Sequence, residues 1–199
     1  SCHDPNFGFD DPDADLPVSE GVIPGLFGGR NSPISAYAMY APSLHFDEDE
    51  GLWIGGQFWD GRATGEVLGD PLADQALGPF LNPVEMANIS KAQVIDDIKV
   101  SAYGSLFEQV WGPGSLDDVE AAYDQVALSI AAFERTSLFA QFNSKYDYYL
   151  MACLEAGVDK DDCATGSGKG ARKVARRFFS RDEFNGMMLF MGENDNDGH

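Results

Sequence analysis

The stretch Ser115-Leu-Asp-Asp-Val-Glu-Ala-Ala-Tyr-Asp-Gln-Val-Ala-Leu-Ser-Ile-Ala-Ala-Phe-Glu-Arg135 decides the fold class of this chain. Its apolar residues recur at intervals of three and four, which places them on one face of an α-helix. They are Leu116, Val119, Tyr123, Val126, Ile130 and Phe133. Ser115 is a typical N-cap residue, and Asp117, Asp118 and Glu120 would lie where negative charge favours the helix dipole. The pattern predicts a long helix, capped by Ser115, with one buried face.

Shorter helical patterns lie on both sides of this segment. We predict helices from about Ser90, over Tyr103 to Trp111, over about Lys145 to Ala156, in a basic segment after Gly170, and from Ser180 through Phe190. Ser90 and Ser180 are each followed three residues later by Gln or Glu, which is the spacing of a capping box. No segment alternates over five or more residues as a strand would. The expected fold class is mostly α.

Residues 1–60 differ from the rest, because they are rich in Pro and Gly and show little clean periodicity. We expect this part of the chain to be loop-rich. A long segment without regular structure needs something else to hold it in place. A cofactor or a larger partner domain would do so.

Charge excludes several classes of function. The 199 residues include 13 basic and 33 acidic side chains, for a net charge of −20. Nucleic acids and anionic membranes call for a basic surface, so neither is expected as a partner. With 44% hydrophobic residues the chain is not typical of disorder. No apolar run approaches the roughly 20 residues that a membrane span needs.

One segment of this acidic chain is basic. Six of the 13 basic residues lie between positions 169 and 181, where there is no acid: Lys169, Arg172, Lys173, Arg176, Arg177 and Arg181. The segment could guide an acidic redox partner. The alternative is a solvated face whose cations pair with the acids of the protein itself.

The three cysteines divide into a pair and a single residue. Cys153 and Cys163 flank a short polar segment, and a local disulfide between them would indicate an oxidising compartment. Two free thiols are the alternative. Cys2 is followed directly by His3, which matches the last two residues of the haem c attachment motif Cys-x-x-Cys-His. A chain end with a free thiol is the other interpretation.

Two non-periodic segments, Phe58 to Ala63 and Gln75 to Met86, place polar groups among apolar neighbours. Turn-rich segments of this kind often build ligand pockets. A carboxyl group there, such as Glu85, could move protons. The structural alternative is that Trp59 belongs to the core and Glu85 forms a salt bridge with Arg62.

The sequence resembles the bacterial dihaem cytochrome c peroxidase family, including its MauG-like branch. The matching pieces, in family order, are Ser1 to Pro5, Pro17 to Gly21, Arg30 to Pro33, Phe58 to Ala63, Gln75 to Met86, and Ala131 to Thr136. The resemblance implies cytochrome c-like domains. We expect an N-terminal peroxidatic haem c domain over residues 1–165. Residues 166–199 would be a linker and the start of a second haem c domain that continues beyond the chain.

The resemblance also implies roles for individual residues. Cys2 would form a thioether bond to the haem, and His3 would be the axial ligand of its iron. Gln75 and Glu85 match the distal pair that positions peroxide and moves its proton, and Pro79 matches a distal-pocket proline. Trp59 matches a tryptophan between the two haems. Asn31 matches a ligand of a calcium ion between the domains.

Two departures from the family pattern bear on the site. Typical members have a histidine in the loop before Arg30 that caps the iron until reduction, but residues 21–29 contain none. We therefore expect an iron open to peroxide. His45 is the only rival cap, and we expect it to be exposed to solvent in an insertion. The second departure is the longer stretch between Trp59 and Gln75, which would reshape the mouth of the pocket.

The end of the chain has acids at alternate positions, Glu193, Asp195 and Asp197, followed by Gly198. This resembles the start of an EF-hand calcium loop. A solvated acidic loop is the alternative.

The resemblance predicts a haem oxidoreductase that activates hydrogen peroxide. The electrons would come from a small cytochrome or copper protein. Alternatively, peroxide would serve to oxidise Trp or Tyr on a partner protein. A hypothesis of another class is a calcium-binding or electron-transfer module without catalysis. Haem c is attached after export, so we expect a periplasmic or cell-surface protein.

Overall fold

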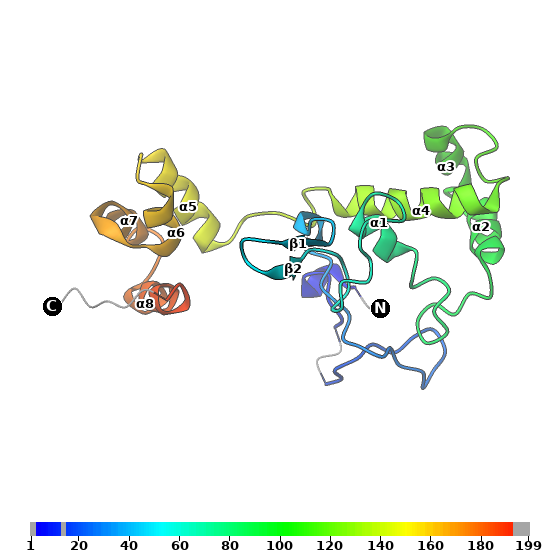
Figure 1. Ribbon diagram of the computed structural model, residues 1–199, viewed down its shortest axis with the longest axis horizontal. Helices are drawn as coiled ribbons and strands as arrows, with labels where there is room; N and C mark the ends of the chain where they lie inside the picture. Colours follow the sequence, from blue (N-terminus) through cyan, green and yellow to red (C-terminus); the bar gives the residue numbers. More distant parts are fainter. Residues whose placement is uncertain (1–2, 13–14, 193–199) are drawn as a thin grey trace. The chain divides into compact units, whose positions relative to one another are not determined.

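The computed structural model describes residues 3–12 and 15–192 and is mostly helical, with one small two-stranded sheet. This confirms the expected fold class. The chain forms two compact units, Ser1–Ala140 and Gln141–His199 (Figure 1). The assignment of residues 1–165 to one haem domain stays a prediction, because packing alone does not test it.

The core of the first unit lies between α2 (Lys91–Val100) and α4 (Val119–Glu134). Its buried members are Val94, Ile95, Leu116, Ala122, Tyr123 and Val126. The helix α3 (Gly104–Trp111) follows α2, and the short α1 (Pro71–Ala76) packs on α4 through Leu72 and Ala73. Both α1 and α2 therefore pack on the long helix, whose C-terminal end lines the cavity described below.

The predicted N-cap of the long helix was wrong. The helix is capped by Asp118, whose side chain accepts hydrogen bonds from the backbone N–H groups of Glu120 and Ala121, both at 3.1 Å. Ser115 lies in a preceding turn that its own N–H closes on Gly112. Asp118 satisfies two of the unpaired N–H groups of the first turn at once, and its negative charge suits the helix dipole.

The other two predicted caps are confirmed. The hydroxyl of Ser90 accepts from the N–H of Gln93 at 3.2 Å, and that of Ser180 from the N–H of Glu183 at 3.3 Å. Only the second forms the complete reciprocal box. The side chain of Gln93 instead accepts from the N–H of Ile89 at 2.9 Å.

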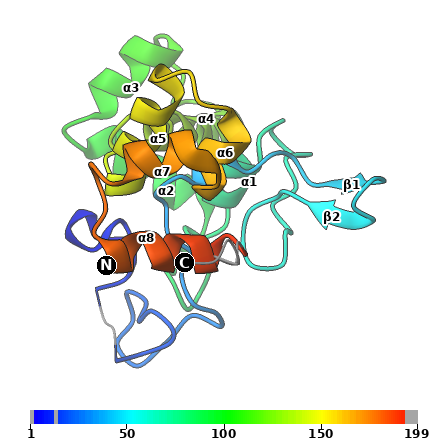
Figure 2. The same cartoon turned by 90° about the vertical axis from the view of Figure 1, so that its left-hand side faces the viewer.

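The first 60 residues are loop-rich, as expected. They hold two short 3₁₀ helices, η1 (Pro5–Phe7) and η2 (Ala38–Tyr40), and an antiparallel hairpin of β1 (His45–Asp47) and β2 (Leu52–Ile54). The hairpin projects away from α1 and α4 (Figure 2). It was not predicted, because strands of three residues are too short to show an alternating pattern.

A buried carboxylate organises the longer stretch between Trp59 and Gln75. Asp74 accepts hydrogen bonds from the N–H groups of Gly65 at 2.8 Å, Val67 at 3.2 Å and Leu68 at 2.8 Å. The helix α1, to which it belongs, starts with Asp70 as N-cap and a proline at its first position. An Asp before a Pro is a helix-start signal, although no helix was predicted here.

The second unit contains α5 (Lys145–Glu155), α6 (Lys160–Thr165), α7 (Gly168–Ala175) and α8 (Arg181–Phe190). The predicted disulfide between Cys153 and Cys163 is present and joins α5 to α6. Both cysteines are fully buried. The polar segment between them includes the start of α6, which Asp159 caps through its side chain.

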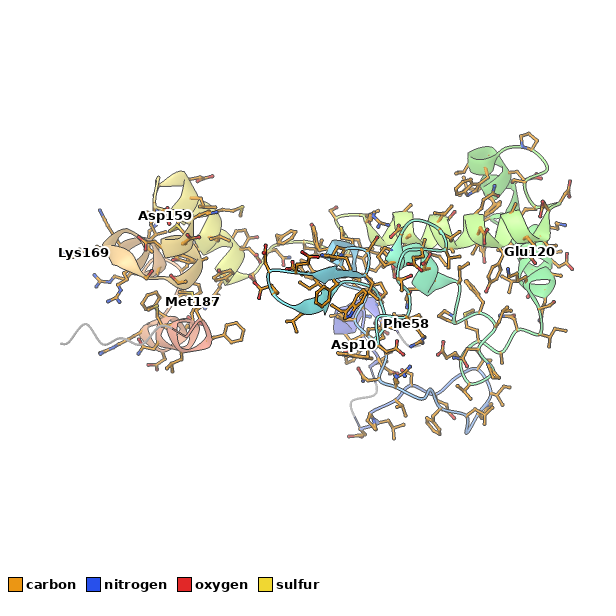
Figure 3. All side chains as sticks on the ribbon, in the orientation of Figure 1. Asp10, Phe58, Glu120, Asp159, Lys169 and Met187 are labelled. Atoms are coloured by element: carbon orange, nitrogen blue, oxygen red, sulfur yellow. A yellow bond between two sulfur atoms is a disulfide. The ribbon has the colours of Figure 1, made fainter. Side chains whose placement is uncertain are left out.

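The basic segment covers α7, the residues that follow it and the first residue of α8. Five of its cations are exposed: Lys169, Lys173, Arg176, Arg177 and Arg181. Lys169 is labelled in Figure 3. This exposure fits a surface that guides an acidic redox partner, and it fits a solvated face equally well. Among the described residues no helix is long and apolar enough to cross a membrane.

Low pH should weaken the packing of α8, because Glu183 becomes protonated. Hydrogen bonds from Lys145, at 2.6 Å, and from Ser180 lower the pKa of Glu183 from 4.5 to about 2. A lowered pKa contributes stability above pH 4.5, and this contribution is lost as the pH falls toward 2. We expect Glu183→Gln to remove this part of the acid dependence of unfolding. Urea unfolding at pH 7, 4.5 and 3 measures it, with Asp182→Asn as the control for charge. An unchanged pH profile in Glu183→Gln would contradict the assignment.

Candidate functional site

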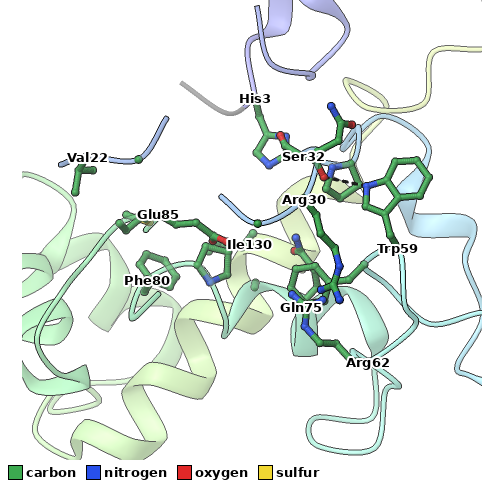
Figure 4. A pocket seen from close by; sticks show the side chains of 18 of the residues that line it. His3, Val22, Arg30, Ser32, Trp59, Arg62, Gln75, Phe80, Glu85 and Ile130 are labelled. Atoms are coloured by element: carbon green, nitrogen blue, oxygen red, sulfur yellow. Dashed lines mark hydrogen bonds between the residues drawn. The ribbon is translucent and has the colours of Figure 1, made fainter. Parts of the chain in front are cut away.

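A cavity of about 640 Å³ opens in the first unit between the N-terminal loops, α1 and the end of α4. It brings together all six described residues for which the sequence predicted a role in the site: His3, Asn31, Trp59, Gln75, Pro79 and Glu85. Figure 4 shows His3 on one side of this space, with Gln75 and Glu85 on the other. Cys2 lies outside the described residues.

His3 is held by a tight turn at the start of the chain. The carboxylate of Asp4 caps η1 by accepting from the N–H of Asn6 at 2.8 Å, and Phe9 follows with a left-handed φ of 64°. This turn brings the carbonyl oxygen of Phe9 to 3.0 Å from Nδ1 of His3. When Nδ1–H donates to that carbonyl, Nε2 carries the lone pair that a metal ion requires.

The two residues across the cavity are fixed by different means. Gln75 lies in the last turn of α1, which Asp74 ties to the preceding loop. Glu85 lies in a turn of the backbone that starts at Asn82. The side-chain amide of Asn82 donates to Oε1 of Glu85 at 2.7 Å, which leaves the second carboxylate oxygen to act on a ligand.

The structural alternative placed Trp59 in the core and paired Glu85 with Arg62, and it was wrong on both points. The side chain of Trp59 is 68% exposed, and its Nε1–H donates to the carbonyl oxygen of Asn31 at 2.9 Å. Arg62 pairs with Asp60 at 2.8 Å, not with Glu85. Its guanidinium also lies over the ring of Phe58, 3.7 Å from the centroid.

Two cations line the cavity of this acidic chain. Arg30 and Arg62 both pair with Asp60, at 3.1 Å and 2.8 Å. Desolvation raises the pKa of Asp60, but hydrogen bonds from Arg62 and the charges of both guanidinium groups outweigh it and lower that pKa. Asp60 therefore stays ionised and holds both guanidinium groups at the cavity.

These groups fit a haem. The cavity offers an apolar lining from Phe58, Pro79, Phe80 and Ile130, an imidazole for the iron, and two guanidinium groups that match the two carboxylates of the macrocycle. His3 is the one histidine among the described residues of the lining. His45 is exposed on β1, as expected, with Nδ1 at 2.9 Å from the carbonyl oxygen of Ser43.

Sequence reasoning missed Glu134, the last residue of α4, which also lines the cavity. Burial raises its pKa, while a hydrogen bond from Ser35 and the charges of His3 and Arg135 act in the opposite direction. The matching piece Ala131 to Thr136 contained Glu134, but an amphipathic helix pattern gives no role to a carboxylate on its last turn.

No group of three or more His, Cys, Asp or Glu side chains suited to a metal ion exists within residues 3–12 and 15–192. The side-chain amide of Asn31 donates to the carbonyl oxygen of Pro17 at 3.3 Å. The EF-hand-like run from Glu193 to Asp197 lies outside the described residues. The two calcium predictions therefore remain predictions.

Comparison with known proteins places this geometry in context. The family model for di-haem cytochrome c peroxidase matches residues 1–153. The methylamine utilization protein MauG of Paracoccus denitrificans is 44% identical over 151 residues, which are 74% of this chain and 37% of that protein. The cytochrome c551 peroxidase of Nitrosomonas europaea is 34% identical over 94 residues, 47% of this chain and 24% of that protein.

A solved structure agrees with these matches. The diheme peroxidase BthA from Burkholderia thailandensis superposes with a TM-score of 0.66 and 32% sequence identity, over 78% of this chain and 40% of that one. The chain spans less than half the length of each of these relatives.

Proposed function

Since this chain belongs to the di-haem cytochrome c peroxidase family, we propose that its cavity binds a haem c and that the protein reacts with hydrogen peroxide there. One observation carries the proposal: His3 and the pair Gln75 and Glu85 line opposite sides of one cavity (Figure 4). If His3 held the iron of a haem, the side lined by Gln75 and Glu85 would be left for peroxide. A proton-moving group is then needed on that second side.

Each residue has a task in this proposal. Cys2 would hold a haem through a thioether bond and His3 would hold its iron. Arg30 and Arg62 would pair with the carboxylates of the macrocycle. The bound haem supplies an iron that exchanges electrons with peroxide.

The distal residues handle the proton. Glu85 takes a proton from one peroxide oxygen and returns it to the other, so that the second oxygen leaves as water. Gln75 orients peroxide through its amide, and Pro79 narrows the space beside it. Trp59 provides an exposed aromatic ring at the cavity for electron transfer toward a second haem.

The other cofactors, the electron donor and the location are proposed from the resemblance to the family. We propose two haems in the full-length protein, one of them attached in this chain, and a calcium ion bound through Asn31. Electrons would come from a small cytochrome or copper protein. Because haem c is attached after export, the protein would be periplasmic or on the cell surface.

A second function is peroxide-dependent oxidation of Trp or Tyr on a partner protein. The absence of histidine from residues 21–29 favours it, since an iron without a capping histidine needs no prior electron. A relative named MauG, 44% identical, supports this alternative. Its discriminating result is peroxide consumption that requires the partner protein and not a reduced electron donor.

The visible spectrum of the full-length protein as isolated tests the proposal. We expect haem staining on a denaturing gel and a high-spin ferric signal from the haem that His3 ligates. Two low-spin bis-histidine haems would contradict the open iron. A protein without covalent haem would contradict the whole proposal, and haem that does not respond to peroxide would favour the non-catalytic electron-transfer module.

A further inference from the structure

We propose that residues 19–28 position Glu85 for proton transfer, through the backbone of Gly21 and Val22. From its sequence this segment stands out only because residues 21–29 contain no histidine. In the structure, Gly21 and Val22 line the same cavity as Glu85, and Figure 4 shows Val22 on a segment beside the one that carries Glu85. The inference rests on the proposed function, because it takes Glu85 to be the group that moves the proton.

Residues 19–28 form a hairpin that is held together by its own backbone. The N–H of Gly21 donates to the carbonyl oxygen of Leu26 at 2.9 Å, and the N–H of Gly28 donates to that of Ser19, also at 2.9 Å. These two hydrogen bonds close the hairpin near its tip and at its base. The hairpin therefore has a fixed shape of its own, and it can support a neighbouring turn.

The hairpin meets the turn that carries Glu85 at two adjacent residues. The N–H of Val22 donates to the carbonyl oxygen of Glu85 at 2.8 Å. A Cβ atom on Gly21 would lie 2.7 Å from the same carbonyl oxygen, and nearer still to that of Val84. Both oxygens belong to the backbone, so the turn would have to move to admit a side chain. The hydrogen bond from Val22 therefore depends on glycine at position 21, where the two backbones approach closely.

Three hydrogen bonds hold Glu85 in this arrangement. Its N–H donates to the carbonyl oxygen of Asn82 at 3.0 Å, and its carboxylate accepts from the side-chain amide of Asn82 at 2.7 Å. These two bonds form within the turn. The third bond, from Val22, joins the turn to a distant part of the chain. It therefore contributes to where the turn, and with it the carboxylate, lies against the cavity.

Gly21→Ala is expected to slow the reaction with hydrogen peroxide by about 10- to 100-fold, because it displaces the Glu85 turn. A proton is transferred only between groups within hydrogen-bond reach. A displacement of about 1 Å can cost about 100-fold in rate. Stopped-flow absorbance of the full-length, haem-loaded protein measures the rate constant.

Two further variants test whether the contact with the turn is responsible. Val22→Pro removes the N–H donor and should slow the reaction as Gly21→Ala does. Gly28→Ala is the matched control, because Gly28 belongs to the same hairpin and a Cβ atom there would lie at ordinary contact distances, 3.5 Å and 3.7 Å from its nearest neighbours. This control should react within a few-fold of wild type.

A double variant separates the positioning of Glu85 from general damage to the cavity. In a protein that already carries Glu85→Gln, we expect Gly21→Ala to cause little further loss of rate. The group that it displaces no longer transfers a proton, so the two effects should not add. Damage to the whole cavity would slow both backgrounds by the same factor, and that result would overturn the inference.

Hydrogen exchange tests the hydrogen bond from Val22 without turnover. The Val22 amide should be protected in the wild-type protein, less protected in Gly21→Ala, and unchanged in Gly28→Ala. Rapid exchange of this amide in the wild type would overturn the inference. So would a wild-type rate of reaction with peroxide in both Gly21→Ala and Val22→Pro. A wild-type protein that does not react with peroxide would instead contradict the proposed function.

Discussion

Glu85→Gln is expected to slow the reaction of the oxidised protein with hydrogen peroxide by about 10²- to 10⁴-fold, the range that general acid–base catalysis contributes. Gln has nearly the same shape as Glu and can still accept the hydrogen bond from Asn82. It cannot take up a proton at neutral pH. The variant therefore keeps the geometry of the cavity and loses only the proton transfer between the two peroxide oxygens. Stopped-flow absorbance of the haem after mixing with peroxide measures the rate constant.

The matched control is Glu20→Gln, because Glu20 also lines the cavity. Its carboxylate accepts from the N–H of Gly25 at 2.6 Å, a bond that Gln can also accept. This variant should react with peroxide within a few-fold of wild type. A Glu85→Gln protein that binds haem normally and reacts at the wild-type rate would remove Glu85 from the mechanism. The two alternative peroxide-dependent functions share this step, so the prediction applies to both.

The sequence predicted the distal pair through its motif but not the reasons for its position. Gln75 was placed in a turn-rich segment, whereas it lies on α1, a helix of only six residues. So short a helix shows no periodicity, and its start could be recognised only from Asp70 and Pro71. The role of Asp74 depends on three N–H groups that lie before it in the chain. Such a contact has no local sequence signal.

On the side of the cavity where His3 lies, the contacts likewise have no local sequence signal. His3 could be recognised from the cysteine before it, and the long helix from its apolar spacing. The contact between Ser35 and His3 joins residues 32 positions apart, and Glu134, which lines the same cavity as His3, lies far from both in the sequence. Only the folded chain brings them together. The caps at Ser90 and Ser180 could be predicted because each is formed within four residues.

Asp74→Asn is expected to lower the free energy of unfolding of the first unit by about 2–5 kcal/mol, because it disrupts a buried carboxylate that satisfies several donors. Asp74 is 8% exposed and accepts from three N–H groups, one on Oδ1 and two on Oδ2. Asn has only one acceptor oxygen, so its NH₂ group must face at least one of these donors. The freed loop would also release Gln75.

Urea unfolding of the full-length protein, followed by tryptophan fluorescence, measures this loss. Asp96→Asn on α2 is the matched control, because Asp96 is exposed and the change of charge is identical. It should alter the free energy of unfolding by less than about 0.5 kcal/mol. A similar small effect in Asp74→Asn would mean that the loop between Trp59 and Gln75 does not depend on this carboxylate. If the loop does depend on it, Asp74→Asn should also slow the reaction with peroxide, since Gln75 would no longer be held against the cavity.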